Sequence, residues 1–191
     1  MSDTKSVSRV IAHLRKLNES GDHMAFVAGG WVRDKMNCVE PKDVDIFVVG
    51  NGVSVESVKS INLDYFGITQ TFGNSEGSGN SGMRDDVIGV LKYDDIDVDI
   101  VVMRSTTVDG VVSNFDVSIC QVVGLLEGDK ISVYATDDYL DWGRKDVIYQ
   151  YIDILTTQRH LDRVRVKYDV ELTPVDSRVQ PLIKIGELYA E

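Results

Sequence analysis

Cysteine, proline and long hydrophobic runs are all scarce in this chain of 191 residues. Its two cysteines, Cys38 and Cys120, are too few for a disulfide framework or a cysteine zinc site, which favours a reducing, cytoplasmic setting. No run approaches the ~18 apolar residues that a membrane-spanning helix needs. The polar, amphipathic N-terminal segment is not typical of a secretory signal.

Positive charge is also in short supply. Lys and Arg number 20 against 31 Asp and Glu, which gives a net charge of −11. Broad contact with a nucleic-acid backbone depends on clustered cations, so we expect no extended, non-specific nucleic-acid binding. A local basic patch remains compatible with this charge, and surplus acid suits a site that holds divalent cations.

The apolar patterning predicts strands interleaved with helices. Residues 6–18 have helical spacing, and short helices are predicted at 31–37 and 53–61. Strands are predicted at 24–28, 44–49, 68–72, 86–93, 97–103 and 131–134. Residues 115–126 suit a buried element of either type. This order predicts an α/β or α+β domain with a mixed sheet.

Three further segments complete the pattern. The glycine- and serine-rich stretch 73–82 is predicted to be a flexible loop or flap. Residues 144–168 are predicted to be helical, with a break near Thr156-Thr157. The stretch from Thr173 onward contains Pro174 and Pro181 and is expected to be irregular or packed along the surface.

A glycine pair, Gly29-Gly30, stands between a predicted strand and a predicted helix. At a helix start, unpaired backbone N–H groups and the positive end of the helix dipole point outward together. Glycine also lets a phosphate approach the main chain without a Cβ in the way. Because a bare glycine pair is more often a simple tight turn, a phosphate site needs support from neighbouring residues.

Asp43 and Asp45 supply that support. They lie two residues apart along a predicted strand, so their carboxylates project from the same face. At about 6–7 Å they would repel by about 2–3 kcal/mol at an effective dielectric near 20. Mg²⁺ takes carboxylate and phosphate oxygens and would relieve that repulsion. The alternative is a solvated edge pair, but the apolar run 46–49 is typical of a central strand, where idle acids are costly.

A two-metal phosphoryl-transfer site needs a further acid, and residues 94–104 supply candidates. Asp97 and Asp99 share a face by the same alternation, and Asp99 is preferred because it lies deeper in the apolar run. Asp94 and Asp95 are more simply explained as a polar turn.

Arg159 and Arg163 are four residues apart on the C-terminal helix and share a face that could meet a nucleotide or phosphate. Ion pairs with acids such as Asp162 on a solvated face are an equal alternative. The histidines, including His160, show no common spacing and are assigned no ligand role.

Together these residues resemble the DNA polymerase β-type nucleotidyltransferase superfamily, and especially the head domain of CCA-adding enzymes and bacterial poly(A) polymerases. The family pattern Gly-Gly-x-Val-Arg-Asp stands at residues 29–34, and its Pro-Lys-Asp-x-Asp pattern stands at 41–45. The spacing from Asp99 to Arg104 resembles the family's third acid and its following arginine. Residues 159–168 resemble the arginine-rich helix of the family's neck.

The resemblance implies an α+β fold: a nucleotidyltransferase head over residues 1–143, with a mixed, mostly antiparallel sheet flanked by helices, and a helical neck over 144–191. It implies that Asp43, Asp45 and Asp99 are catalytic and hold two Mg²⁺ ions, with Mn²⁺ as a substitute. An acceptor hydroxyl would attack the α-phosphate of a nucleoside triphosphate such as ATP and release pyrophosphate. The implied nucleotide-binding residues are Gly29, Gly30, Arg33, Lys42, Arg159 and Arg163, where Arg33 would support the phosphates or brace Asp34.

The departures from the family leave the substrate open. Phe115 replaces the arginine of an Arg-Asp motif, and the neck lacks the family's acid pair, so base preference is not carried over. The family's tRNA-binding body has no counterpart in this sequence, so we do not expect the protein to bind a whole tRNA directly. Three acceptors stay open: an RNA 3′ end, a small molecule and a protein side chain. An RNA acceptor would make RNA processing the broad role. A catalytically silent nucleotide-binding module and a regulatory protein with a structural cation site are the alternatives.

Overall fold

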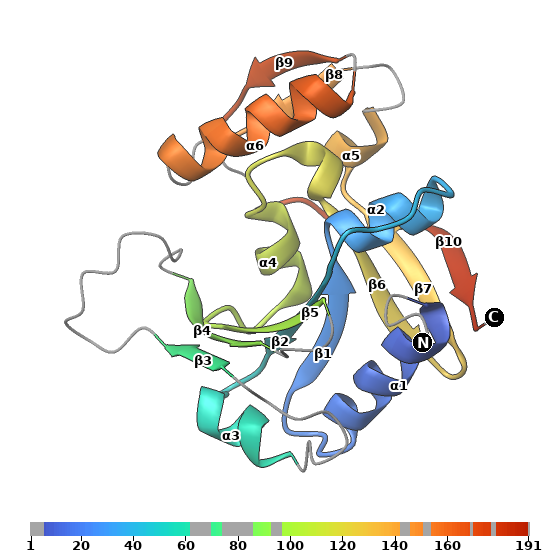
Figure 1. Ribbon diagram of the computed structural model, residues 1–191, viewed down its shortest axis with the longest axis vertical. Coiled ribbons are helices and arrows are strands. Elements are labelled where there is room, and N and C mark those ends of the chain that lie inside the picture. Colours follow the sequence, from blue (N-terminus) through green and yellow to red (C-terminus); the bar gives the residue numbers. More distant parts are fainter. Residues whose placement is uncertain are drawn as a thin grey trace.

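The computed structural model describes residues 6–61, 70–73, 86–92, 97–141, 146–150, 154–168, 170–176 and 179–190. Within them, eight strands form one sheet in the order β10-β7-β6-β1-β2-β5-β4-β3 (Figure 1). Every neighbouring pair is antiparallel except β2 and β5, which are parallel. The strands are β1 (Met24–Ala28), β2 (Val44–Val49), β3 (Gln70–Gly73), β4 (Val87–Lys92), β5 (Val98–Met103), β6 (Val122–Glu127), β7 (Lys130–Ala135) and β10 (Ile183–Tyr189).

Helices flank this sheet, which confirms the predicted α+β class and mixed, mostly antiparallel sheet. The helices are α1 (Val7–Asn18), α2 (Gly30–Met36), α3 (Val55–Ser60), α4 (Val108–Ser113), α5 (Asp137–Asp141) and α6 (Ile154–Lys167). Residues 115–126, whose secondary structure the sequence left undecided, contain a 3₁₀ turn (Ser118–Cys120) and most of β6. None of the described helices is both long and apolar enough to cross a membrane.

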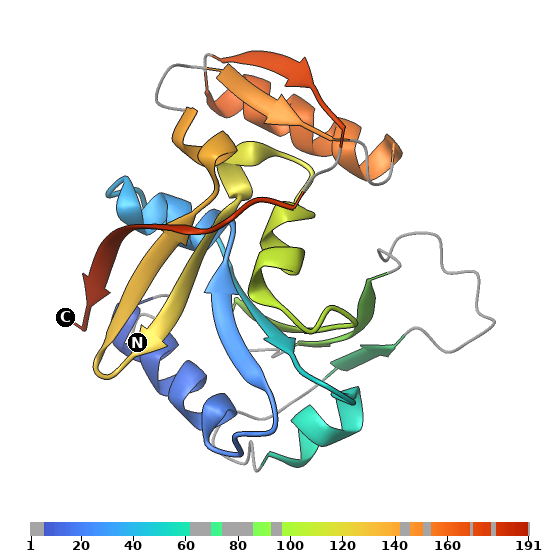
Figure 2. The same ribbon diagram turned by 180° about the vertical axis from the view of Figure 1, so that it is seen from behind.

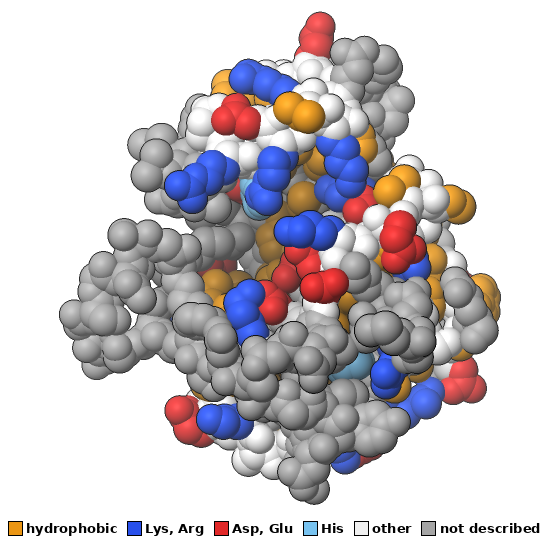
Figure 3. All heavy atoms as spheres, in the orientation of Figure 1, with side chains coloured by type: hydrophobic (Ala, Val, Ile, Leu, Met, Phe, Trp, Pro, Cys, Tyr) orange, Lys and Arg blue, Asp and Glu red, His pale blue; other side chains and the backbone are white. Residues whose placement is uncertain are grey.

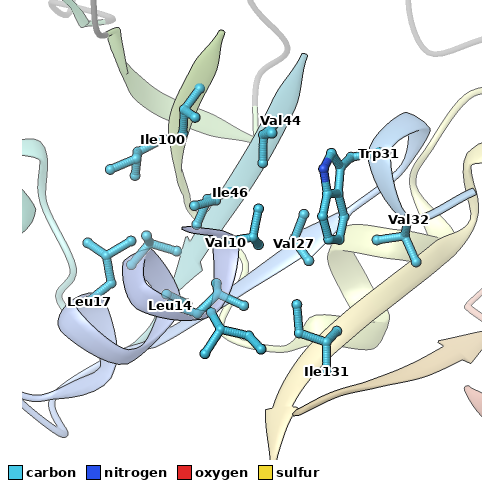
Figure 4. Packing of buried hydrophobic residues seen from close by; sticks show 14 of the residues in the cluster. Val10, Leu14, Leu17, Val27, Trp31, Val32, Val44, Ile46, Ile100 and Ile131 are labelled. Atoms are coloured by element: carbon cyan, nitrogen blue, oxygen red, sulfur yellow. The ribbon is translucent and has the colours of Figure 1, made fainter. Parts of the chain in front are cut away.

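One face of the sheet is covered by α1. Ser6 caps this helix by accepting a hydrogen bond from the Arg9 N–H, and its apolar stripe lies on β1, β2 and β5 (Figure 4). In β2, Ile46 and its alternate neighbours point into this core, so the intervening side chains point to the opposite face. Trp31 is also fully buried here, as expected of a core residue. The alternation of β2 therefore assigns Asp43 and Asp45 to the face away from α1.

Among the described residues, the opposite face is covered in part, by α4 and by the segment around Phe115. A third apolar cluster joins α6 to the 3₁₀ turn and to a two-stranded ribbon of β8 (Asp146–Tyr149) and β9 (Glu171–Pro174). Leu161 and Val164 anchor α6 in this cluster. The helix is thereby held above the uncovered part of the sheet face, as Figure 1 shows.

The C-terminal predictions need three corrections. Residues 146–149 form a strand, because pairing with β9 and burial of Val147 outweigh the local helical pattern. Helix α6 begins at Ile154 and runs through Thr156-Thr157 without a break. The stretch after Thr173 is irregular over the described residues 175–176 and 179–182, but β10 then returns to pair with β7 at the edge of the main sheet (Figure 2).

Several predictions fall partly or wholly on residues outside the described ranges, among them the polar turn at Asp94 and Asp95 and residues 144–145 and 151–153 of the predicted C-terminal helix. Of the strand predicted at 68–72, residues 70–72 belong to β3 and residues 68–69 are not described. The predicted loop 73–82 lies outside the description apart from Gly73. The remaining predicted strands agree with β1, β2, β4, β5 and β7 to within a residue or two at each end.

Candidate functional site

A cavity of about 540 Å³ opens between the uncovered sheet face and α6. Figure 3 shows it as a hollow below α6, with Lys and Arg side chains along the upper rim and acidic and apolar atoms inside. Its floor is apolar: Phe47 lies with its ring centroid 5.4 Å from that of Phe115, and Val101 and Met103 lie beside them. A volume of this size is ordinary for a small-molecule site.

The acids predicted to be catalytic lie at or beside this cavity. Asp45 of β2 and Asp99 of β5 are direct partners in the parallel pairing of the two strands. Asp43, immediately before β2, lines the cavity together with Asp45. Burial raises the pKa of Asp45 to about 7, and the negative charges of Asp43 and Asp99 add to that shift. The structure thus places Asp99 beside Asp45, although Asp99 itself is outside the cavity lining.

This donor set consists of carboxylate oxygens, the ligands that Mg²⁺ and Mn²⁺ accept. The raised pKa of Asp45 means that its negative charge is incompletely compensated, which a bound cation would correct. Among the described residues, however, no three His, Cys, Asp or Glu side chains converge as a preformed metal centre. Asp99 is instead engaged by Lys92, whose Nζ lies 2.5 Å from Oδ2. Metal binding by the three acids therefore remains a prediction.

The glycine pair lies on the cavity wall at the start of α2. Gly29 has a φ of 72°, the left-handed region that favours glycine. Its N–H donates to the Val122 carbonyl at 2.9 Å, so this donor ties the turn to β6 and is not directed at a ligand. A phosphate contact would have to use other groups of the turn, and it remains a prediction.

Arg33 lines the cavity and lies against Asp34, which lines it too. Its Nε and a terminal nitrogen lie 2.8 and 2.7 Å from Asp34 Oδ1, and both side chains are buried. Lys167 of α6 adds a second cation 3.5 Å from Asp34, and the Arg33 guanidinium lies 5.5 Å from the centre of the Tyr168 ring. Of the two roles that the sequence left open, the geometry supports bracing of Asp34.

Of the other three residues predicted to bind the nucleotide, two line the cavity and one does not. Lys42 lines the cavity, is highly exposed and has its Nζ 3.7 Å from Asp43 Oδ2. Arg163 also lines the cavity, whereas Arg159 is exposed and lies outside the lining. The i,i+4 spacing therefore does not bring both arginines to the same site.

Sequence reasoning missed two polar groups on the cavity wall. His160 of α6 has Nδ1 2.8 and 2.9 Å from the two carboxylate oxygens of Asp116. Thr157, one helical turn earlier, is 1% exposed, and its hydroxyl has no hydrogen-bond partner among the described residues. Helical spacing among 157, 160 and 164 was the available signal, but periodicity alone does not say which face of a helix meets a cavity.

Cations line the cavity from α6, and acids line it from the sheet side, where Lys42 lies beside Asp43. Arg163 and Lys167 project from α6 above the acids of the sheet, with the apolar floor beyond them. Such an arrangement can hold an anionic ligand between the cations of the helix and a cation bound by the carboxylates.

Several solved structures share this architecture. A tRNA-processing enzyme in an apo form superimposes with a TM-score of 0.60 at 16% identity, over 90% of this chain and 44% of its own. The Thermotoga maritima CCA-adding enzyme complexed with tRNA superimposes with a TM-score of 0.57 at 17% identity, over 85% of this chain and 38% of its own. A CCA-adding enzyme complexed with ATP has a TM-score of 0.57 at 15% identity, over 85% of this chain and 39% of its own. The chain spans about two fifths of the length of these proteins.

No protein-family model matches the chain, and no curated protein sequence does. At identities this low the structural likeness establishes the fold. The chain has the fold of the matched part of these CCA-adding enzymes, which confirms the resemblance at the level of the fold.

Proposed function

We propose that the protein is a metal-dependent nucleotidyltransferase, which moves a nucleoside monophosphate from a nucleoside triphosphate to an acceptor hydroxyl and releases pyrophosphate. The observation that carries the proposal is the pairing of Asp45 with Asp99 on neighbouring strands, with Asp43 on the same cavity wall. The fold adds support, because solved CCA-adding enzymes of this fold include complexes with ATP and CTP.

Asp43, Asp45 and Asp99 are the residues that would hold two Mg²⁺ ions, or Mn²⁺ in their place. When bound, such ions neutralise charge on the triphosphate and favour loss of the proton from the acceptor hydroxyl. The protein's own contribution is to fix Asp45 and Asp99 in register on two strands whose backbones are hydrogen-bonded together, with Asp43 directly before the first of these strands.

The remaining groups of the cavity fit the triphosphate. Arg163 and Lys167 supply positive charge on the wall facing the acids, and Lys42 supplies it at the rim. Gly29 and Gly30 leave room beside the backbone at the start of α2. The apolar floor limits water near the reacting atoms, which strengthens every charge interaction within the cavity.

The acceptor is an RNA 3′ end, a small molecule or a protein side chain. A complex of the Thermotoga maritima CCA-adding enzyme with tRNA supports the first, and RNA processing would then be the broad role. The net charge of −11 weighs against a long nucleic acid. We also propose a cytoplasmic setting, since both cysteines are free thiols.

One observation favours a second candidate, a catalytically silent nucleotide-binding module. Asp99 is engaged by Lys92, so the third acid is not free in this structure. Such a module would bind a nucleoside triphosphate and transfer nothing.

The two candidates separate in one assay. The protein is incubated with each α-³²P-labelled nucleoside triphosphate, Mg²⁺ and either total RNA or a small-molecule and protein extract. The enzyme predicts label transfer that is lost in Asp43→Asn and Asp45→Asn and kept in Asp129→Asn, which changes a fully exposed carboxylate paired with Arg15. Triphosphate binding without transfer to any acceptor would favour the silent module, and failure to bind any triphosphate would refute both.

A further inference from the structure

Lys92 is the last residue of β4 and lies directly across from Asp99 in the antiparallel pairing of β4 and β5. Asp99 in turn lies across from Asp45 in the parallel pairing of β5 and β2. Residues paired across neighbouring strands point to the same side of a sheet. The backbone register therefore sets a row of one cation and two acids across three adjacent strands.

The charge of Lys92 acts on both acids. Its Nζ lies 2.5 Å from Asp99 Oδ2, and its positive charge also lowers the pKa of Asp45, against the raising effects of burial, Asp43 and Asp99. A cation in this place offsets part of the repulsion among the carboxylates, as a bound metal ion would. With a side chain 46% exposed, Lys92 can also leave Asp99 without opening a hole in the core.

We propose that Lys92 is a built-in counter-cation that occupies Asp99 in the nucleotide-free protein. The resting protein then takes one divalent ion, at Asp43 and Asp45, and the place at Asp99 opens only when Lys92 moves away. This inference rests on the proposed function, because it assumes that the acids bind divalent ions. It makes Lys92 a positioning residue that keeps the second ion from binding before the triphosphate arrives.

Binding of Mn²⁺ to the full chain without nucleotide tests the inference. Free Mn²⁺ is followed by electron paramagnetic resonance during titration of the wild type, Lys92→Met, Lys92→Arg and Lys59→Met. Lys59 lies on α3, which does not line the cavity, so it provides the same chemical change away from the site. Circular dichroism and the melting temperature check that each variant is folded.

The wild type, Lys92→Arg and Lys59→Met are expected to bind one Mn²⁺ per chain. Lys92→Met is expected to gain a second site, or to bind about tenfold more tightly, a change that corresponds to about 1.4 kcal/mol. Lys92→Met with the stoichiometry and affinity of the wild type would overturn the inference. So would two equal sites in the wild type.

The outcomes also separate this inference from the proposed function. If Mn²⁺ binding is lost in Asp45→Asn but is the same in Lys92→Met as in the wild type, the proposed function stands and only the role of Lys92 is refuted. No Mn²⁺ binding by either the wild type or Lys92→Met removes both. Binding by Lys92→Met but not by the wild type would contradict the one-ion resting state and overturn the inference as stated.

Discussion

Asp45 and Asp99 are paired across two parallel strands, β2 and β5, so the backbone hydrogen bonds hold the two carboxylates as neighbours. No side-chain rearrangement is needed to bring these acids together. Their closeness is therefore a property of the fold, and its electrostatic cost is present whenever no cation is bound.

That cost predicts a pH-dependent stability. The pKa of Asp45 is raised to about 7, above its ordinary value of 3.8, so the folded state holds the proton more tightly than the unfolded state. The stability contributed by this proton is fully present at low pH and is lost as pH rises through about 7. We expect the metal-free protein to be less stable at pH 8 than at pH 5.5, by about 1–2 kcal/mol after allowance for partial exposure.

Denaturant unfolding at the two pH values measures this difference. Asp45→Asn should flatten the dependence, whereas Asp129→Asn should leave it unchanged because that carboxylate is fully exposed. Mg²⁺ should stabilise the wild type more at pH 8 than at pH 5.5. A wild type as stable at pH 8 as at pH 5.5 would show that Asp45 is not perturbed.

The brace between Arg33 and Asp34 gives a second prediction. Arg33→Lys keeps the charge but loses the two-nitrogen contact with Asp34, so we expect a loss of about 1–3 kcal/mol in the free energy of unfolding. Arg15→Lys is the matched control, because Arg15 pairs with Asp129 at an exposed position. If Arg33→Lys weakened triphosphate binding and left stability untouched, Arg33 would contact phosphate instead.

A third prediction concerns the way α6 is held above the cavity. His160 binds both oxygens of Asp116, which joins α6 to the segment before the 3₁₀ turn. Asp116→Asn should weaken this link and lower the free energy of unfolding by about 1–3 kcal/mol. It should also weaken triphosphate binding, because Arg163 and Lys167 are carried by the same helix.

Asp162→Asn, on the exposed side of α6, serves as the control for that variant. Fluorescence titration with a labelled triphosphate measures the affinity of both proteins. An Asp116→Asn protein with wild-type stability and affinity would mean that the pair neither holds nor positions the helix.

The C-terminal segment offers a fourth prediction. Gln180 is buried, its N–H donates to Ser113 Oγ at 3.0 Å, and its side-chain amide donates to Asp138 Oδ2 at 2.5 Å. These bonds fix the chain just before β10 joins the sheet. Gln180→Ala should cost about 1–3 kcal/mol, since it leaves Asp138 without this partner.

Gln158→Ala, which removes an exposed contact with Asp162, should change stability by less than about 0.5 kcal/mol. Amide exchange in β10 and β7 would report whether the loss is local. Equal stabilities of the two variants would contradict a fixing role for Gln180.

The central elements could be predicted because their patterns are local. The alternation of buried and half-buried side chains along β2 predicts the face that carries Asp43 and Asp45, and the glycine pair predicts the turn into α2. Asp99 was identified by the same alternation, and its pairing with Asp45 follows from the order of the strands. These features needed no long-range information beyond the two strands being neighbours.

The remaining features depend on distant contacts that no local pattern encodes. Pairing of β8 with β9 turned a helical-looking segment into a strand, and pairing with β7 ordered a proline-containing tail as β10. The contact of His160 with Asp116 joins residues 44 positions apart. Arg163 lines the cavity and Arg159 does not, and the sequence could not separate them, because spacing says which residues share a helix face but not which face meets the cavity.

The measurement closest to the central claim is a crystal structure with Mn²⁺ and a triphosphate analogue that cannot be cleaved between the α- and β-phosphates. Nucleotidyl transfer predicts anomalous Mn²⁺ density at Asp43 and Asp45, with the α-phosphate beside it and the triphosphate between the sheet and α6. Asp99 should then face the same metal site, released from Lys92. A triphosphate bound elsewhere, or Mn²⁺ remote from these carboxylates, would contradict the account.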